Sequence, residues 1–141
     1  MQLEYVPTDI VPTGDETDRL HRWGYRAYRE MFNDRQLLGL EMSSRGLMRQ
    51  PDQRLRDALS TNLSDLLRYQ NMLCRYDARS LKSLDIFSVH GFPVGLVQCE
   101  SNLLGIQEGR KNVGSWGWSN IVQKYATAME YLARNLRVAR F

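Results

Sequence analysis

The chain has 141 residues, 43% of them hydrophobic and 25% charged, which is the size and composition of one globular domain. The formal net charge is +3, and 16 of the 19 basic residues are arginine, a side chain that binds phosphate and carboxylate in a bidentate manner. No run of 18 apolar residues and no secretory signal pattern is found, so we expect a cytoplasmic location without a membrane span.

The fold class that the pattern predicts is mainly α: a compact helical domain of about four to six helices that allows one short strand. Residues 1–14 contain Pro7, Pro12 and Gly14 and predict an extended N-terminal arm. Residues 15–141 are expected to form a single helical domain. The thiols of Cys74 and Cys99 are expected to remain separate, although a disulfide is possible on paper.

Residues 15–31 show helical periodicity with two stripes. Leu20, Trp23, Ala27 and Met31 form an apolar stripe, and the other stripe consists of Arg19, Arg22, Arg26 and Arg29. The arginine stripe is a candidate DNA-phosphate site, and the alternative is a solvated face balanced by Glu16, Asp18 and Glu30. Gly24 weakens the segment and allows two short helices in its place.

Two longer helices are predicted next. Asn33 and Gln36 form a capping-box pattern at the start of a helix that Pro51 bounds. Asp52 opens the longest predicted helix, which runs to about Tyr76 because leucines recur at spacings of three and four up to Leu73.

The remaining third of the sequence is less regular. Residues 81–90 predict a short helix, and residues 94–99 predict either a buried strand or a helix start. Residues 107–117 predict a loop. Ser119 is expected to cap a final helix with one apolar face, formed by Ile121, Val122, Tyr125, Met129, Leu132 and Leu136.

The loop before the final helix is a second candidate DNA-binding site. Arg110 and Lys111 precede Trp116 and Trp118, and exposed aromatic rings beside cations can stack on unpaired bases. The alternative is that the tryptophans anchor the loop onto the core. No phosphate-binding loop, nucleophile elbow or metal-ligand spacing is found, so no catalytic residue, cofactor or metal is predicted for this chain.

A polar cluster is predicted around the end of the longest helix. Asn71, Cys74 and Arg75 follow an apolar helical face, and Glu100 and Asn102 follow the apolar run before them. We interpret these five residues as structural. Cys74 is expected to face the core, and Asn71 and Arg75 to tie the helix end to its neighbours.

Three blocks then carry a resemblance to a known family. Residues 25–40, which contain Arg35-Gln-Leu-Leu38, residues 71–76 (Asn71-Met-Leu-Cys-Arg-Tyr76) and Glu100-Ser-Asn102 followed by Leu-Leu-Gly occur in order. Together with the Gly/Trp-rich stretch at 114–118, they resemble the central region of large bacterial adenine-specific DNA methylases associated with anti-phage islands. The similarity covers residues 18–132. Tyr28, Glu30 and Leu103 depart from the family pattern.

In that family the similar region lies between the cofactor motif and the catalytic Asp/Asn-Pro-Pro-Tyr motif, which stacks on a flipped adenine. Neither motif occurs in this sequence. The resemblance therefore implies a non-catalytic helical module or split subunit of a DNA adenine methylase system, with a catalytic polypeptide and DNA as partners. The alternative is a purely structural protein–protein interaction module without DNA contact.

Overall fold

A computed structural model describes residues 3–80, 82–88, 91–94, 97–109, 111–113 and 117–138. The side chains of residues 111–113 and 136–138 lie outside this description. The elements are the helices α1 (Asp18–Arg22), α2 (Asp34–Met48), α3 (Gln53–Leu67) and α4 (Trp118–Val138), the 3-10 helices η1 (Tyr28–Met31) and η2 (Ile86–Ser88), and the strands β1 (Tyr76–Asp77), β2 (Lys82–Ser83), β3 (Ile106–Glu108) and β4 (Lys111–Val113). The prediction of a mainly α chain is confirmed.

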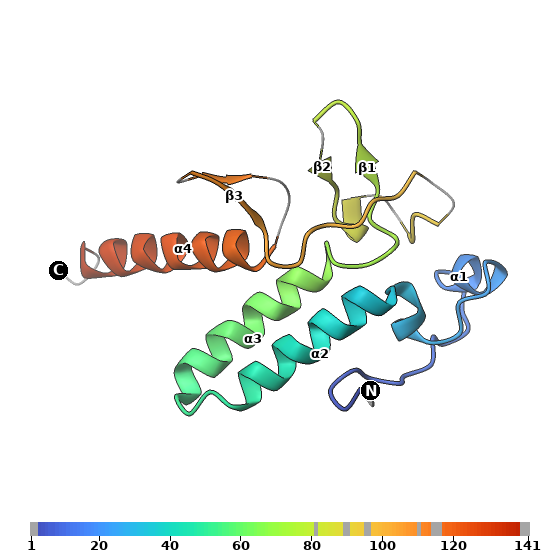
Figure 1. Cartoon of the computed structure of the whole chain (residues 1–141), viewed down its shortest axis with the longest axis horizontal. Coiled ribbons are helices and arrows are strands. Elements are labelled where there is room, and N and C mark those ends of the chain that lie inside the picture. Colours follow the sequence, from blue (N-terminus) through green and yellow to red (C-terminus); the bar gives the residue numbers. More distant parts are fainter. Residues whose placement is uncertain are drawn as a thin grey trace.

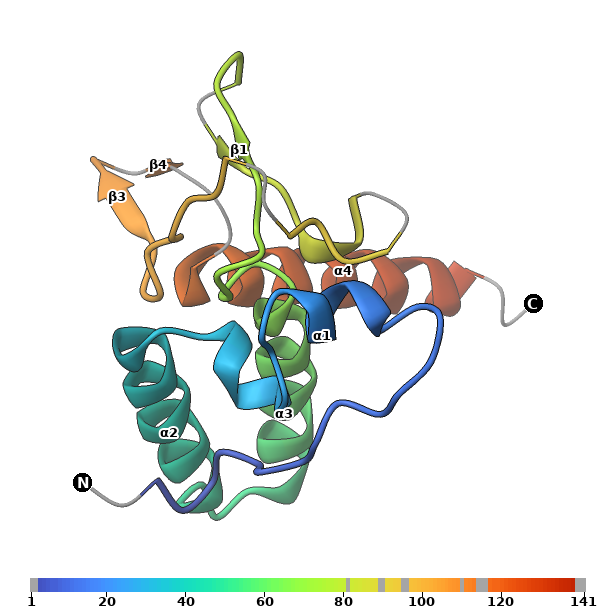
Figure 2. The ribbon, with the colours of Figure 1, turned by 90° about the vertical axis from the view of Figure 1, so that its right-hand side faces the viewer.

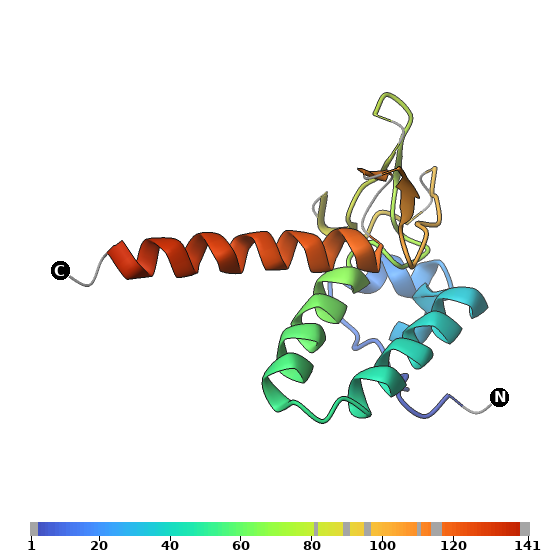
Figure 3. The ribbon, with the colours of Figure 1, turned by 60° about the vertical axis from the view of Figure 1, so that its left-hand side comes forward.

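Helices α2 and α3 form an antiparallel pair, and α4 packs across the end of α3 (Figure 1). The four strands form two antiparallel hairpins, β1–β2 and β3–β4. These hairpins lie on one side of the base of α4, and the α2–α3 pair lies on the other (Figure 3). The C-terminal half of α4 projects beyond the rest of the chain.

The starts of α2 and α3 follow from their capping residues. The Asn33 side chain accepts a hydrogen bond from the backbone N–H of Gln36, and the Gln36 side chain accepts one from the N–H of Asn33. Asp52 accepts from the N–H groups of Arg54 and Leu55. These bonds satisfy donors that an uncapped helix leaves free, so both predicted helix starts are confirmed.

The main apolar core joins segments that are distant in sequence. Its buried side chains come from the arm, α1, η1, the segment after α3, η2 and the segment at 92–94, and they are Val11, Leu20, Met31, Leu73, Ile86 and Val94. The end of the predicted arm is thus part of the core. Residues 4–17 run alongside α1, η1 and α2 rather than away from them (Figure 2).

The segment at 15–31 is not one helix. It divides into α1 and η1, as the position of Gly24 allowed, because Gly24 adopts φ +95°, a left-handed conformation that interrupts an α-helix. The apolar stripe is wrong at Trp23, which is 61% exposed, whereas Leu20 and Met31 are buried. The proposed arginine stripe therefore has no continuous helix to carry it.

The end predicted for the helix that begins after Asp52 is also wrong. Helix α3 ends at Leu67, nine residues before the predicted end at Tyr76. The Asn71 side chain donates to the carbonyl of Leu67 and accepts from the backbone N–H of Leu73, and these bonds hold residues 68–74 in turns. Leu73 is buried, but it reaches the core from a turn and not from a helical face.

Three further predictions change in the second half of the chain. The described part of residues 81–90 forms β2 and the 3-10 helix η2 in place of an α-helix. Residues 94–99 are neither a strand nor a helix where described, apart from an isolated bridge between Arg75 and Gln98. The expected loop at 107–117 contains the β3–β4 hairpin, and α4 begins at Trp118, one residue before Ser119. Within the described ranges, no helix is long and apolar enough to cross a membrane.

Candidate functional site

Hydrogen bonds join the first of the three blocks, at residues 25–40, to the second and to the third, and we call this region the junction. The backbone N–H of Met72, in the second block, donates to the carbonyl of Met31, in the first block, at 2.7 Å. Because Met31 closes η1 and Met72 follows α3, this bond joins the start of the α2–α3 pair to its end.

Glu100 connects the third block to the first. Its Oε2 accepts hydrogen bonds from Asn33 Nδ2 at 2.9 Å and from an Arg35 guanidinium nitrogen at 2.6 Å. Asn33 is also the N-cap of α2. Glu100 follows the isolated bridge at Gln98 and anchors this part of the chain to the first turn of α2. This contact agrees with the structural role predicted for Glu100.

Asn102 shapes the turn that leads to the β3–β4 hairpin. Its Oδ1 accepts from the N–H groups of Leu104 and Gly105, and its carbonyl accepts from the side chain of Gln70. The neighbouring Leu103 packs against Gly39 of α2 so closely that a Cβ on Gly39 would lie 2.2 Å from a methyl group of Leu103. The third block is thereby held against both α2 and the end of α3.

The predicted cluster at 71–75 has local structural partners. Asn71 organises the turn after α3, and the Cys74 thiol donates to the carbonyl of Arg68 at 3.3 Å. An Arg75 guanidinium nitrogen donates to the hydroxyl of Ser88 at 3.1 Å. Asn71 and Cys74 bond at the end of α3, whereas Arg75 bonds at the end of η2. The side chains of the cluster therefore do not point toward one common site.

The two thiols are separate, and Cys74 is fully buried while Cys99 is half-buried. Burial raises the pKa of Cys74 to about 11 and also raises the pKa of Cys99. A thiolate is the nucleophilic form of cysteine, so neither environment activates the sulfur. The Cys74 prediction of a core-facing thiol is confirmed.

The four arginines of the first candidate DNA site have different environments. Arg19 donates to the carbonyl of Val94, and Arg26 donates to the carbonyls of His21 and Tyr25. Arg22 is exposed on α1, and Arg29 is half-buried in η1. Among the described residues, the side chains of Arg22 and Arg29 make no hydrogen bond or ion pair, so these two keep their guanidinium groups available.

Glu30, one of the three acids expected to balance the arginine stripe, has another role. Glu30 accepts hydrogen bonds from the backbone N–H groups of Arg26 and Ala27, and these bonds lower the pKa of Glu30. Its main role is therefore to stabilise the backbone before η1, and its Coulombic attraction to Arg26 is a smaller contribution.

The second candidate DNA site lies mostly outside the described part of the chain. Arg110 and Trp116 fall outside it, as does the side chain of Lys111 in β4. The indole N–H of Trp118 donates to Ser43 Oγ at 2.9 Å, and its backbone N–H donates to the carbonyl of Leu103. Trp118 thus anchors the base of α4 to α2, as the alternative reading of the tryptophans expected.

Sequence analysis missed Glu41, which holds the arm in place. Its carboxylate accepts hydrogen bonds from the backbone N–H groups of Glu4 and Tyr5, at 3.0 and 2.8 Å, and from Arg45 at 2.7 Å. Burial acts to raise the pKa of Glu41, but these three hydrogen bonds outweigh it and lower the pKa. An acid on the leucine-bearing face of a predicted helix, with an arginine four residues later, was the signal available in the sequence.

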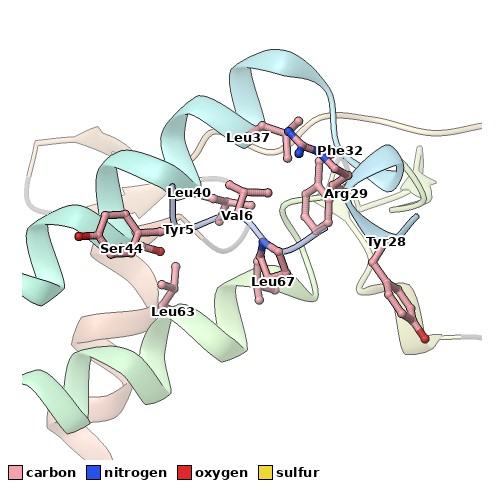
Figure 4. A pocket seen from close by; sticks show the side chains of 11 residues that line it. Tyr5, Val6, Tyr28, Arg29, Phe32, Leu37, Leu40, Ser44, Leu63 and Leu67 are labelled. Atoms are coloured by element: carbon pink, nitrogen blue, oxygen red, sulfur yellow. The ribbon is translucent and has the colours of Figure 1, made fainter. Parts of the chain in front are cut away.

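The arm covers an apolar groove of about 340 Å³ between η1, α2 and α3 (Figure 4). Arg29 is the one charged side chain among the residues that line it, which are Tyr5, Val6, Pro7, Tyr28, Arg29, Phe32, Leu37, Leu40, Ser44, Leu63 and Leu67. The groove can accept an apolar group but holds no arrangement of acid, base and nucleophile.

Arg68 is the second residue that sequence analysis missed. Its guanidinium pairs with Asp65 of α3 at 3.0 Å and with Asp85 before η2 at 2.7 Å, and its carbonyl accepts from the N–H of Ile86. Arg68 therefore ties the end of α3 to η2. The role of Arg68 was not predicted because the sequence placed this residue inside a helix, whereas it directly follows the end of α3.

The described residues contain no group of three or more histidine, cysteine, aspartate or glutamate side chains that could hold a metal ion. Comparison with protein-family models, with curated protein sequences and with solved structures found no match to this chain.

Proposed function

We propose that this chain is a non-catalytic helical module, or split subunit, of a DNA adenine methylase system. In this proposal it supports a catalytic polypeptide and helps to position DNA. The observation that carries it is the junction, where the first block bonds to the second through Met31 and Met72 and to the third through Asn33 and Glu100. Their polar groups are used to hold helices and turns together, which supports an architectural role for the resemblance.

A partner experiment tests the first half of the proposal. The open reading frames that flank the gene are examined for a polypeptide with the Asp/Asn-Pro-Pro-Tyr motif, and that polypeptide is coexpressed with this chain carrying an affinity tag. We expect the two to copurify and the complex to methylate adenine in DNA. A flanking methylase that neither binds this chain nor depends on it would contradict the proposal.

A DNA-binding experiment separates the proposal from the alternative of a purely structural module. The use of Arg19 and Arg26 in internal hydrogen bonds favours that alternative. We expect Arg22→Ala combined with Arg29→Ala to weaken binding of a DNA duplex and to reduce the dependence of log K on log salt by about two, because each lost phosphate contact removes about one unit.

Arg54→Ala is the matched control, since Arg54 is an exposed arginine on α3 whose side chain makes no bond within the described ranges. Fluorescence anisotropy at low and high salt gives both quantities. If wild-type protein does not bind DNA even at low salt, the structural alternative is correct and the DNA part of the proposal is wrong.

A further inference from the structure

The apolar groove beneath the arm has walls that the fold holds in place. The face of α2 that carries Leu37 and Ser44 forms one wall, and the face of α3 that carries Leu63 forms another (Figure 4). Residues 5–7 of the arm form a third wall, and Glu41 fixes the arm by accepting from two of its backbone N–H groups. Because these walls are already ordered, a ligand would not have to order them on binding.

The groove has the size of a short alkyl chain. Its volume of about 340 Å³ lies at the small end of the range of ligand pockets in proteins. Leu37 and Ser44 are seven residues apart on α2, which corresponds to a length of roughly 10 Å along the helix. An extended alkyl chain of about eight carbons has this length.

One end of the groove carries a cation without a partner. Figure 4 shows Arg29 at the end that Phe32 and Leu37 line, with Ser44 at the opposite end. Arg29 is half-buried, and among the described residues its guanidinium makes no hydrogen bond or ion pair. The acid next to it, Glu30, is already bonded to two backbone N–H groups before η1.

The combination of an apolar lining and one cation selects the chemistry of a ligand. A guanidinium forms two parallel hydrogen bonds with a carboxylate, and their attraction is stronger beside apolar side chains than in water. The remaining lining residues carry no charge, so a second ionised group farther along the ligand would lose its hydration without gaining a partner.

We propose that the groove binds a small aliphatic monocarboxylate. Its carboxylate lies at Arg29, and its alkyl chain lies between α2 and α3 beneath the arm. This inference goes beyond the methylase proposal, because it requires neither DNA nor a partner polypeptide. Since Arg29 is also a candidate phosphate contact, the test is made without DNA.

An NMR titration of the full chain with sodium octanoate tests the proposal. The amide signals of Val6 and Leu40, which line the groove, should shift to saturation with a dissociation constant of roughly 0.1–1 mM. Butanoate should bind at least about tenfold more weakly, because four methylene groups are missing. Ser44→Leu should also weaken octanoate binding about tenfold, because the larger side chain occupies the far end of the groove.

Charge variants test the role of Arg29. Arg29→Ala should weaken octanoate binding about tenfold, because the charged partner is lost. Arg54→Ala removes an exposed arginine outside the groove and should bind octanoate as the wild type does. Wild-type protein should prefer octanoate to the cationic octylamine, and Arg29→Glu should prefer octylamine.

Circular dichroism confirms that each variant is folded before its titration. Three results would each overturn the proposal. The first is the absence of shifts at the groove residues with octanoate. The second is equal binding of octanoate and octylamine, or of octanoate and butanoate, by the wild-type protein. The third is octanoate binding that Arg29→Ala leaves unchanged.

Discussion

Gly117 lies where two segments of backbone approach each other closely. A Cβ placed on Gly117 would lie 2.1 Å from the backbone nitrogen of Gly105 and 2.7 Å from the carbonyl oxygen of Asn102. The atoms in the way are backbone atoms, which cannot rotate aside as a side chain can. Gly117 also accepts hydrogen bonds from Asn120 and Ile121, so this contact fixes the start of α4.

We predict opposite effects from two glycine-to-alanine substitutions. Gly117→Ala should lower the free energy of unfolding by about 2 kcal/mol or more, because overpacking cannot be relieved at a backbone contact. Gly46→Ala should raise it by about 0.5–1 kcal/mol, because Gly46 lies in α2 with open space where a Cβ would be and alanine favours the helix. Thermal unfolding of both variants measures the difference, and equal effects would contradict this account of Gly117.

At the scale of elements, α2 and α3 begin with similar caps but in different surroundings. The described bonds of the Asp52 side chain lie within the first turn of α3, whereas the Asn33 side chain also donates to Glu100 across the junction. The cap of α2 is therefore a local helix signal and a tertiary contact at once.

We predict that Asp52→Ala costs about 1 kcal/mol of unfolding free energy, the usual value for a lost N-cap. Asn33→Ala should cost about 2 kcal/mol, because the hydrogen bond to the charged Glu100 is lost as well. Urea unfolding gives both values. In a Glu100→Ala background the excess cost of Asn33→Ala should disappear, and an excess that persists there would show that Glu100 is not its source.

The elements that sequence analysis identified correctly are those with local signals. The caps at Asn33 and Asp52 depend on residues within three positions of each other, so they are readable from sequence. The end of α3 was misplaced because Leu73 continues the helical spacing, although the Asn71 turn has already ended the helix. Leu73 is buried because it packs with residues from distant segments, such as Val11 and Val94. Helical periodicity alone does not contain that information.

The β3–β4 hairpin had a signal that was overlooked. Glu108 pairs with Lys111, and Gly109, directly after β3, adopts φ +59°. A glycine between two short segments is typical of hairpin turns. In the candidate site, the structural roles of Cys74 and Glu100 were predicted, whereas the division of the four arginines was not, because it follows from the break at Gly24.

At the scale of the whole molecule, the buried carboxylate of Glu41 binds the backbone of the arm to α2, and Glu4 of the arm also pairs with Arg45. The pKa of Glu41 is lower in the folded chain than its ordinary value of 4.5. A carboxyl group with a lowered pKa stabilises the folded arrangement above its ordinary pKa, and that contribution is lost as the pH falls through the lower folded value.

We therefore predict that acidification releases residues 4–5 from α2. The amide NMR signals of Glu4 and Tyr5 should shift as the pH falls through the lowered pKa of Glu41, toward the positions of an unbound segment. Glu41→Gln should give the released positions at neutral pH and remove most of the pH dependence. Glu130→Gln, a change at an exposed acid on α4, should leave the titration unchanged, and an identical titration in Glu41→Gln would assign the release to another group.

The close contact at Gly105 and Gly117 has a mechanical consequence. Helix α4 has 21 residues, so at 1.5 Å per residue it is a rod about 30 Å long that is held at one end. A tilt of about 10° at the held end moves the free end by about 5 Å, which is close to the rise of one helical turn. The close contact between Gly105 and Gly117 is one of the contacts that set the direction of the far end, beside the bond from Trp118 to Ser43, and small rotations there are magnified along the rod.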